Sequence, residues 1–179
     1  VGGGVLVAGL ALWAGAGERP EVLIAPEGRL VGVLGDQGRA VDHKSSASYA
    51  ASIWLRRDGD GAAQEDAALR WESGARTVGD TATLSNGWRL TLVPDRRIAA
   101  AALADRCGER TVLIAPFARI EVDGACIFFG RDRLEATGAL SLSPSGSGLA
   151  IATAAERAGR RYWSMPGGFF ARDDRLGRQ

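Results

Sequence analysis

The chain has 179 residues, of which 46% are apolar, so it can close the hydrophobic core of one ordinary domain without a framework of disulfides. Its 22 basic and 21 acidic residues give a net charge of +1, which excludes a general electrostatic attraction to nucleic acid. Any contact with DNA must therefore come from a local basic patch.

The first seventeen residues carry no charge and consist mainly of Gly, Ala, Val and Leu, with Trp13 near one end. We expect residues 1–17 to be the end of a transmembrane helix that begins upstream of Val1. A buried core helix is the alternative, because a run of this length is marginal for crossing a membrane. Residues 2–4, all glycine, do not predict a phosphate-binding loop, because such a loop follows a strand.

Residues 21–43 predict a meander of three short strands. Residues 22–25 are continuously apolar, which is typical of a buried strand. Turns are expected at Pro26-Glu27-Gly28 and at residues 35–38, which read GDQG and favour a hairpin.

A helix is expected next, capped by Ser45 or Ser46 and ending at residues 57–59. Its apolar face would include Ala50, Ile53 and Trp54 at helical spacing. From residue 58 to residue 79 the chain is rich in Gly, Ala, Asp and Glu without a period, which predicts a surface loop with at most a short turn at 67–71.

A hairpin and a β-α-β unit are expected in the second half. Asn86-Gly87 lies between two alternating stretches and favours a type I′ hairpin turn. The following residues predict a helix capped by Asp95 and then a buried strand at 112–115, so the strands on either side of this helix should be parallel. Further strands and a short helix at 154–158 complete a soluble α/β domain over residues 18–163, followed by a flexible tail at 164–179.

The expected core is a mixed sheet with flanking helices, and a helix at 98–103 should pack on this sheet. The residues expected to be buried in it are Leu23, Ile24, Leu90, Leu92, Val112 and Ile114.

No catalytic centre can be assembled from the sequence. His43 is the only histidine, so a zinc site built from several histidines is excluded, and we interpret His43 as structural or solvent-facing. Neither a G-x-S-x-G motif nor a local cysteine-protease signature is present. Residues 56–61, RRDGDG, resemble a calcium loop but lack its third ligand position and its terminal glutamate.

Cys107 and Cys126 are the only cysteines, and the β-α-β unit should bring them to the same end of the sheet. Two interpretations stay open, either two buried thiols or a disulfide formed in an oxidising compartment.

Four residues near the end of the domain are candidates for DNA contact. Arg160 and Arg161 precede Tyr162 and Trp163, which places cations beside aromatic rings as in proteins that bind single strands. A strand end with solvated arginines is the alternative, and the near-neutral net charge favours it.

Taken together, several segments resemble the C-terminal region of ComEC-type competence proteins in their alphaproteobacterial form. The segments are RPEVLIAPEGR at 19–29, WLRRDGD at 54–60, the region of Cys107, and R-x-W at 161–163, and the resemblance covers residues 5–163. These proteins are inner-membrane channels for transforming DNA. The resemblance therefore implies a domain joined to the channel portion of the same polypeptide, able to touch single-stranded DNA and facing the periplasm, a location that a disulfide would suit.

In the broader family this position often holds a metallo-β-lactamase-like domain. Residues 93–116 resemble the segment that carries a metal-binding aspartate and then a histidine in such domains. Asp95 stands near the first position, but Pro116-Phe117-Ala118 stand where histidines would be, and the H-x-H-x-D-H cluster is absent. The resemblance therefore implies a degenerate fold with no metal, no cofactor and no catalytic residue.

Two other functions remain open. One is a small enzyme with an acidic or serine site that the sequence does not reveal, and the other is an unrelated membrane-anchored domain that binds a protein partner. A deep pocket with convergent ionisable groups would favour the enzyme.

Overall fold

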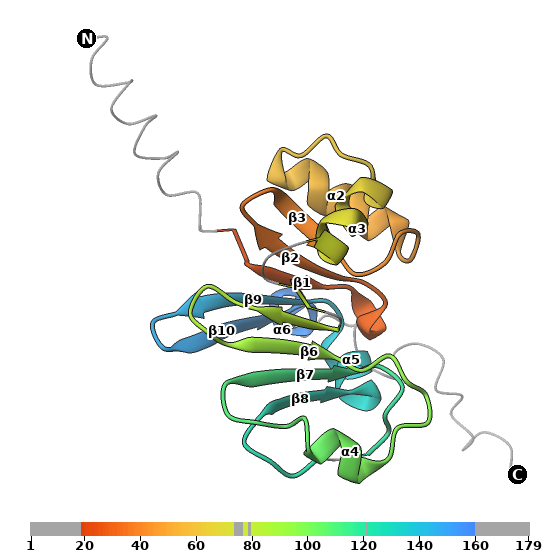
Figure 1. The fold of residues 1–179 in the computed structure, drawn as a ribbon, viewed down its shortest axis with the longest axis vertical. Helices are drawn as coiled ribbons and strands as arrows, with labels where there is room; N and C mark the ends of the chain where they lie inside the picture. Colours follow the sequence, from red (N-terminus) through yellow and green to blue (C-terminus); the bar gives the residue numbers. More distant parts are fainter. Residues whose placement is uncertain (1–18, 74–76, 79, 121, 160–179) are drawn as a thin grey trace, which may run out of the picture.

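The computed structural model describes residues 19–73, 77–78, 80–120 and 122–159 (Figure 1). The predicted end of a transmembrane helix at 1–17, the candidate DNA contacts Arg160, Arg161, Tyr162 and Trp163, and the tail at 164–179 lie outside these residues. Among the helices that are described, none has the length and apolar character needed to span a bilayer.

The first sheet has five strands in the order β10-β9-β1-β2-β3, and each strand is antiparallel to its neighbours. Its strands are β1 (Val22–Ile24), β2 (Val31–Gly35), β3 (Gly38–Val41), β9 (Leu140–Ser145) and β10 (Gly148–Thr153). The short 3-10 turn η1 (Pro26–Gly28) joins β1 to β2, so the predicted meander is confirmed.

The second sheet has the order β4-β5-β6-β7-β8, and its strand directions are mixed. Its strands are β4 (Thr77–Val78), β5 (Thr81–Thr83), β6 (Arg89–Leu92), β7 (Thr111–Ala115) and β8 (Ile127–Gly130). Strands β6 and β7 are parallel, with Leu90 opposite Val112, and β8 is parallel to β7. The parallel pair predicted for the β-α-β unit is therefore confirmed.

The described helices are α2 (Ser48–Asp58), α3 (Gln64–Ser73), α4 (Ala100–Ala104), α5 (Arg131–Thr137) and α6 (Ala154–Ala158) (Figure 1). Helices α2 and α3 cover the outside of the first sheet and α4 covers the outside of the second, whereas α5 packs against η1 and α6 packs against β10. The helix expected at 154–158 is α6, whereas α5 was not predicted.

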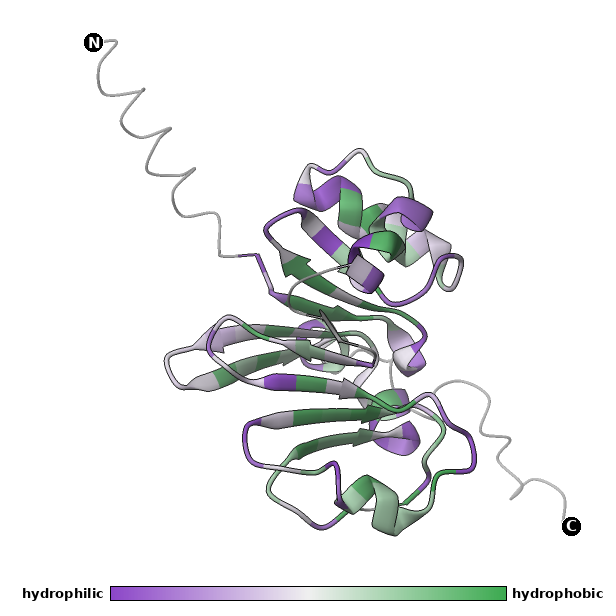
Figure 2. Cartoon of the chain, viewed as in Figure 1, coloured by the Kyte–Doolittle hydropathy of each residue, from purple (hydrophilic) through white to green (hydrophobic). Residues whose placement is uncertain are grey.

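The main hydrophobic core lies between the two sheets, where Figure 2 shows apolar strands facing each other. Val22, Ile24 and Val33 of the first sheet belong to the same buried cluster as Val112 and Ile114 of the second. Two smaller clusters join α2 and α3 to the outside of the first sheet, and α4 to the outside of the second. The described chain is thus arranged in four layers, helix, sheet, sheet and helix.

Strand β7 explains how a continuous apolar run fits this arrangement. All five of its residues are buried. Val112 and Ile114 face the core between the sheets, while Leu113 and Ala115 pack with Leu103 of α4 on the other side. Because successive side chains of a strand point to opposite faces, a strand covered on both faces needs no polar positions.

The expectation of one sheet was wrong, because β1 lies in one sheet and β6 and β7 lie in the other. Ile24, Leu90 and Ile114 are buried as predicted, whereas Leu23 is only half-buried. Leu92 and Val112, the other expected core residues, are buried too.

Neither predicted helix cap forms. Helix α2 begins after Ala47, which has a left-handed backbone conformation (φ 47°) and no side-chain capping bond. The Ser46 hydroxyl does not cap the helix but donates to the carbonyl of Arg29 (2.7 Å). The Asp95 carboxylate accepts from the amide of Arg97 (2.8 Å) and lies before α4.

Two further expectations about local structure were wrong. Residues 64–73 form α3 and not a loop, with Ala67, Ala68 and Trp71 buried. The hairpin between β5 and β6 is present, but its turn is not type I′, since Gly87 has a positive φ (79°) and Asn86 does not. The Leu84 amide donates to the carbonyl of Trp88 (2.8 Å), so residues 85–87 form a three-residue loop that ends in a left-handed glycine.

A candidate binding cleft between the sheets

A cleft of about 440 Å³ opens between the sheets at the carboxyl ends of β6 and β7. Pro94, which follows β6, and Pro116 and Phe117, which follow β7, line it. Ligands of α/β proteins commonly bind at the carboxyl ends of parallel strands, and known ligand pockets have volumes of roughly 300–1,000 Å³. Both the position and the size suit a small ligand.

The opposite end of the sandwich is closed by hydrogen bonds between the sheets. The Ser85 amide and hydroxyl donate to the carboxylate of Glu21 (2.8 and 2.7 Å). The Asn86 amide donates to the carbonyl of Gly148 (2.8 Å), and the Trp88 indole donates to the carbonyl of Ser147 (2.9 Å). These bonds hold the sheets together at one end of the sandwich, and the cleft lies at the other end.

The turn η1 forms one wall of the cleft. Glu27 and Gly28 have positive φ values of 61° and 67°, and a Cβ atom at Gly28 would lie 2.8 Å from Cγ of Pro116. Only glycine meets both requirements at position 28, because it lacks the Cβ atom and tolerates this backbone conformation. The lining residues Val31, Leu92 and Ile114 are buried and form the apolar part of the cleft.

Asp42 and His43 form a polar pair in the cleft. His43 Nδ1 lies 2.9 Å from Oδ2 of Asp42, and Oδ1 of Asp42 accepts from the amide of Val31 (2.8 Å). Burial raises the pKa of Asp42 above 3.8, although the Val31 amide and His43 partly oppose this shift. The pair fixes the orientation of an imidazole ring that is 54% exposed.

Gln64 holds the segment that carries this pair. Its side-chain amide donates to the carbonyls of His43 (2.9 Å) and Ser46 (2.8 Å). A histidine backed by a carboxylate can accept a proton, but catalysis also needs a group for it to activate. The Ser46 hydroxyl does not supply one here, because it donates to the carbonyl of Arg29.

Three arginines at the cleft differ in their partners. Arg29 pairs with Glu27 (3.1 Å) and Arg131 pairs with Glu135 (2.7 Å), and the latter hydrogen bond lowers the pKa of the glutamate. The guanidinium of Arg96 instead lies over the ring of Phe117, 4.6 Å from its centre. The rim therefore carries both signs of charge, with an aromatic ring beneath one cation.

The positions that match the metal-binding segment do not hold metal ligands. Asp95 is exposed and bonded to the backbone, and Pro116, Phe117 and Ala118 offer no ligating side chain. Within the described ranges, no three His, Cys, Asp or Glu side chains are grouped closely enough to hold a metal ion.

The carboxylates of the calcium-like segment are bound by arginines. Asp58 accepts from Nε of Arg39 (2.5 Å), and Asp60 pairs with Arg70. The pairing with Arg70 lowers the pKa of Asp60. Both carboxylates therefore fasten helices and are not arranged around a cation.

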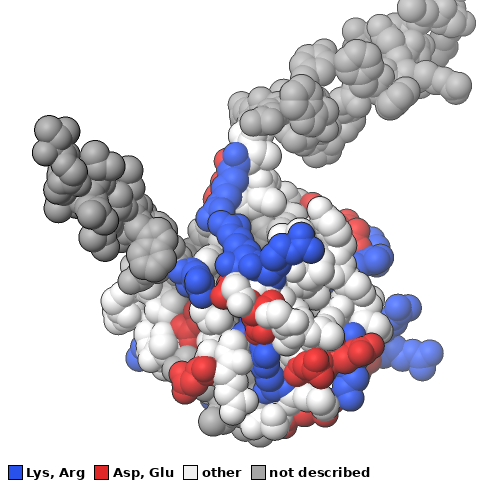
Figure 3. All heavy atoms as spheres, turned by 90° about the horizontal axis from the view of Figure 1, so that it is seen from above, with Lys and Arg blue, Asp and Glu red and all other residues white. Residues whose placement is uncertain are grey.

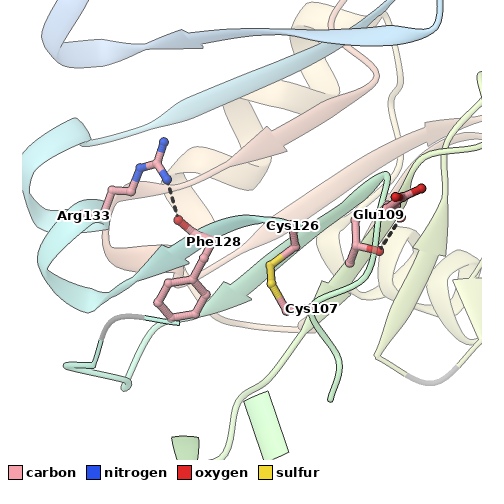
Figure 4. The surroundings of a disulfide bond; sticks show 6 residues. Cys107, Glu109, Cys126, Phe128 and Arg133 are labelled. Atoms are coloured by element: carbon pink, nitrogen blue, oxygen red, sulfur yellow. Dashed lines mark hydrogen bonds between the residues drawn. A yellow bond between two sulfur atoms is a disulfide. The ribbon is translucent and has the colours of Figure 1, made fainter. Parts of the chain in front are cut away.

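Cys107 and Cys126 are joined by a disulfide, with their Cα atoms 4.9 Å apart (Figure 4). Cys107 follows α4, and Cys126 directly precedes β8. In the same view the Arg133 side chain donates to the carbonyl of Phe128 (2.7 Å), which ties α5 to β8. Of the two interpretations left open by the sequence, the structure contains the bridged form.

In comparisons with known proteins, no family model, no curated protein and no solved structure matches this chain. The cleft was not anticipated from the sequence. The sequence feature that could have indicated it is the neighbouring pair Asp42 and His43 at the end of a predicted strand. This pair does not reveal that residues of the other sheet line the same cleft.

Proposed function

We propose that this chain is the non-catalytic C-terminal domain of a ComEC-type inner-membrane channel for transforming DNA, built on a degenerate metallo-β-lactamase-like fold. On this proposal the domain faces the periplasm and is joined to the channel portion of the same polypeptide through residues 1–17. Its role is to support the channel or to guide the incoming strand.

The single observation that carries the proposal is the cleft. It opens between the two sheets of a four-layer domain, at the ends of β6 and β7, beside the segment that resembles the metal-binding segment of the family. On the resemblance, Pro116 and Phe117 stand there where the family would have histidines. This combination supports a retained architecture whose hydrolytic centre has been lost.

Natural transformation of the organism that encodes the chain tests the proposal. Deleting residues 19–179 from the chromosomal gene should abolish transformation, and re-expressing the full protein should restore it. Substitution of His43→Ala should leave the transformation frequency unchanged, because no chemistry is assigned to this histidine. Unimpaired transformation by the deletion strain would refute the assignment.

The Asp42–His43 pair favours a second candidate, an enzyme that uses this cleft. If His43→Ala abolished transformation while the protein remained folded and abundant in the membrane, the enzyme would replace the non-catalytic domain as the better account. Circular dichroism of the purified variant and immunoblotting of membranes provide the two controls.

Contact with DNA is assigned to residues 160–163. A double substitution Arg160→Gln and Arg161→Gln should weaken binding of a fluorescent single-stranded oligonucleotide. The affinity of this variant should also depend less steeply on salt concentration than that of the wild type, since two phosphate contacts disappear. Arg97→Gln with Arg106→Gln removes the same charge from exposed positions near α4 and should leave binding unchanged.

A further inference from the structure

We propose that the outward face of α2 lies on the surface of an anionic phospholipid bilayer. This face consists of Tyr49, Ile53, Arg56 and Arg57. The inference rests on the membrane anchor of the proposed function, but it concerns a different surface and needs no contact with DNA.

The outward face of α2 has an unusual composition. Ala51 and Leu55 of this helix are buried against the first sheet. Tyr49, Ile53 and Arg56, spaced i, i+4 and i+7, therefore share the opposite face. Tyr49 is 82% exposed and Ile53 is 38% exposed. A tyrosine, an aliphatic side chain and arginines on one helix face are the composition of a helix that lies in a membrane interface.

The charges of α2 suit an anionic partner. Arg56 and Arg57 are exposed in its last turn. The only carboxylate of the helix, Asp58, is nearly buried and bound by Arg39, so the exposed residues of α2 are basic or uncharged. Figure 3 views the side on which α2 and α3 lie in Figure 1 and shows both basic and acidic side chains on it. The helix dipole explains cations at this end, but it does not explain Tyr49 and Ile53 in line with them.

The neighbouring helix α3 has the opposite character. Its exposed charged residues are Glu65, Asp66 and Glu72, all acidic. An anionic surface would attract α2 and repel α3, so the two helices predict a definite orientation of the domain. Leu69 of α3 is also exposed (52%), which makes it a matched reference position for Ile53.

The chain reaches the domain beside this face. The Arg19 guanidinium donates to the carbonyl of Asp58, the last residue of α2 (3.1 Å), and Arg39 donates to the carbonyl of Pro20 (3.2 Å). Residue 19 is therefore fixed next to the last turn of α2, which carries Arg56 and Arg57, and a single residue, Glu18, separates it from the uncharged run of residues 1–17. If that run lies in a bilayer, the basic end of α2 is the part of the domain closest to the headgroups.

The test attaches an environment-sensitive fluorophore to Ile53→Cys and, separately, to Leu69→Cys in the full chain, under non-reducing conditions that keep the native disulfide. Each protein is reconstituted into vesicles that contain phosphatidylglycerol and nitroxide-labelled lipid. Fluorescence at position 53 should be quenched several-fold more than at position 69. The difference should shrink at high salt and in vesicles of phosphatidylcholine alone.

Substitution of both arginines supplies the charge control. Arg56→Gln with Arg57→Gln should reduce the ratio of docked to undocked face about fivefold for each arginine removed. Arg97→Gln with Arg106→Gln changes the net charge equally on another part of the surface and should have no effect.

Three results would overturn the inference, and only the first would also contradict the membrane anchor of the proposed function. If the chain does not float with vesicles, both the membrane anchor and the docking of α2 fail. If it floats but positions 53 and 69 are quenched equally, only the docking of α2 fails. If position 53 is shielded from water in detergent micelles and is not reached by the labelled lipid, the face contacts a second copy of the chain instead.

Discussion

Arg39 has the largest fully buried side chain among the described residues. Its guanidinium bonds both carboxylate oxygens of Asp58 (2.5 and 3.4 Å) and donates to the backbone carbonyls of Pro20, Glu21 and Gly32. The side chain thereby connects β3, the end of α2 and the start of the described chain. Burial of a guanidinium is tolerated because every polar atom of this side chain has a partner.

We predict that Asp58→Ala lowers the free energy of unfolding by about 3–5 kcal/mol, because it leaves a buried cation without its carboxylate. Urea denaturation followed by circular dichroism measures this loss. Glu135→Gln breaks an exposed pair with Arg131 and should produce no measurable change. A loss for Asp58→Ala as small as that for Glu135→Gln would contradict the importance of burial.

Asp42 gives the protein a pH-dependent stability of known sign. Burial raises its pKa above 3.8, so the folded protein holds this proton at pH values where the unfolded chain has released it. Relative to Asp42→Asn, the free energy of unfolding of the wild type should rise as the pH falls through the raised pKa towards 3.8. Urea denaturation of both proteins across this window measures the difference. A constant difference, or one that falls with falling pH, would contradict the raised pKa.

At the scale of elements, the sequence predicted those parts whose signal is local and strong. β7 was found because it is apolar at every position, and the β1–β3 meander was found because PEG and GDQG separate apolar runs. The helix α3 was missed because its buried side chains are two alanines and Trp71, set among Glu and Asp residues that also occur in loops. Its stability comes from packing on β3, which no local pattern records.

The disulfide belongs to this scale because it joins the end of α4 to the start of β8, on either side of β7. Closing a loop with a sequence separation of 19 residues restricts the unfolded chain and should stabilise the fold by about 3 kcal/mol. Urea denaturation with and without a reductant measures this contribution.

The variant Cys107→Ala with Cys126→Ala is the control, because its unfolding should not respond to the reductant. Thiol titration of the wild-type protein, unfolded without a reductant, should detect no reactive cysteine. Two reactive thiols per chain would contradict the bridge and would remove one argument for the periplasm.

At the scale of the whole molecule, the division into two sheets could not be predicted. The sequence of each strand is consistent with a single sheet. Strand β1 pairs with β9, which lies more than a hundred residues away along the chain, and no local pattern indicates this pairing. The cleft depends on this division, because its walls come from both sheets. For this reason His43 was interpreted alone, although in the structure it lines the same cavity as Pro94 and Phe117 of the other sheet.

The same arrangement leads to a prediction about metals for the whole protein. Purified chain that has been exposed to excess zinc and then dialysed should contain far less than one zinc ion per molecule by elemental analysis. The physical reason is that a zinc site needs three or four ligands, whereas His43 is the only histidine and both cysteines are bridged. The protein should also fail to degrade single-stranded DNA with zinc, manganese or magnesium, because in the part of the chain that the structure describes no three His, Cys, Asp or Glu side chains could hold an ion against the phosphate. A metallo-β-lactamase-like nuclease assayed in parallel serves as the positive control. One zinc ion per chain, lost on substitution of Asp42 or His43, would show that the cleft binds metal after all.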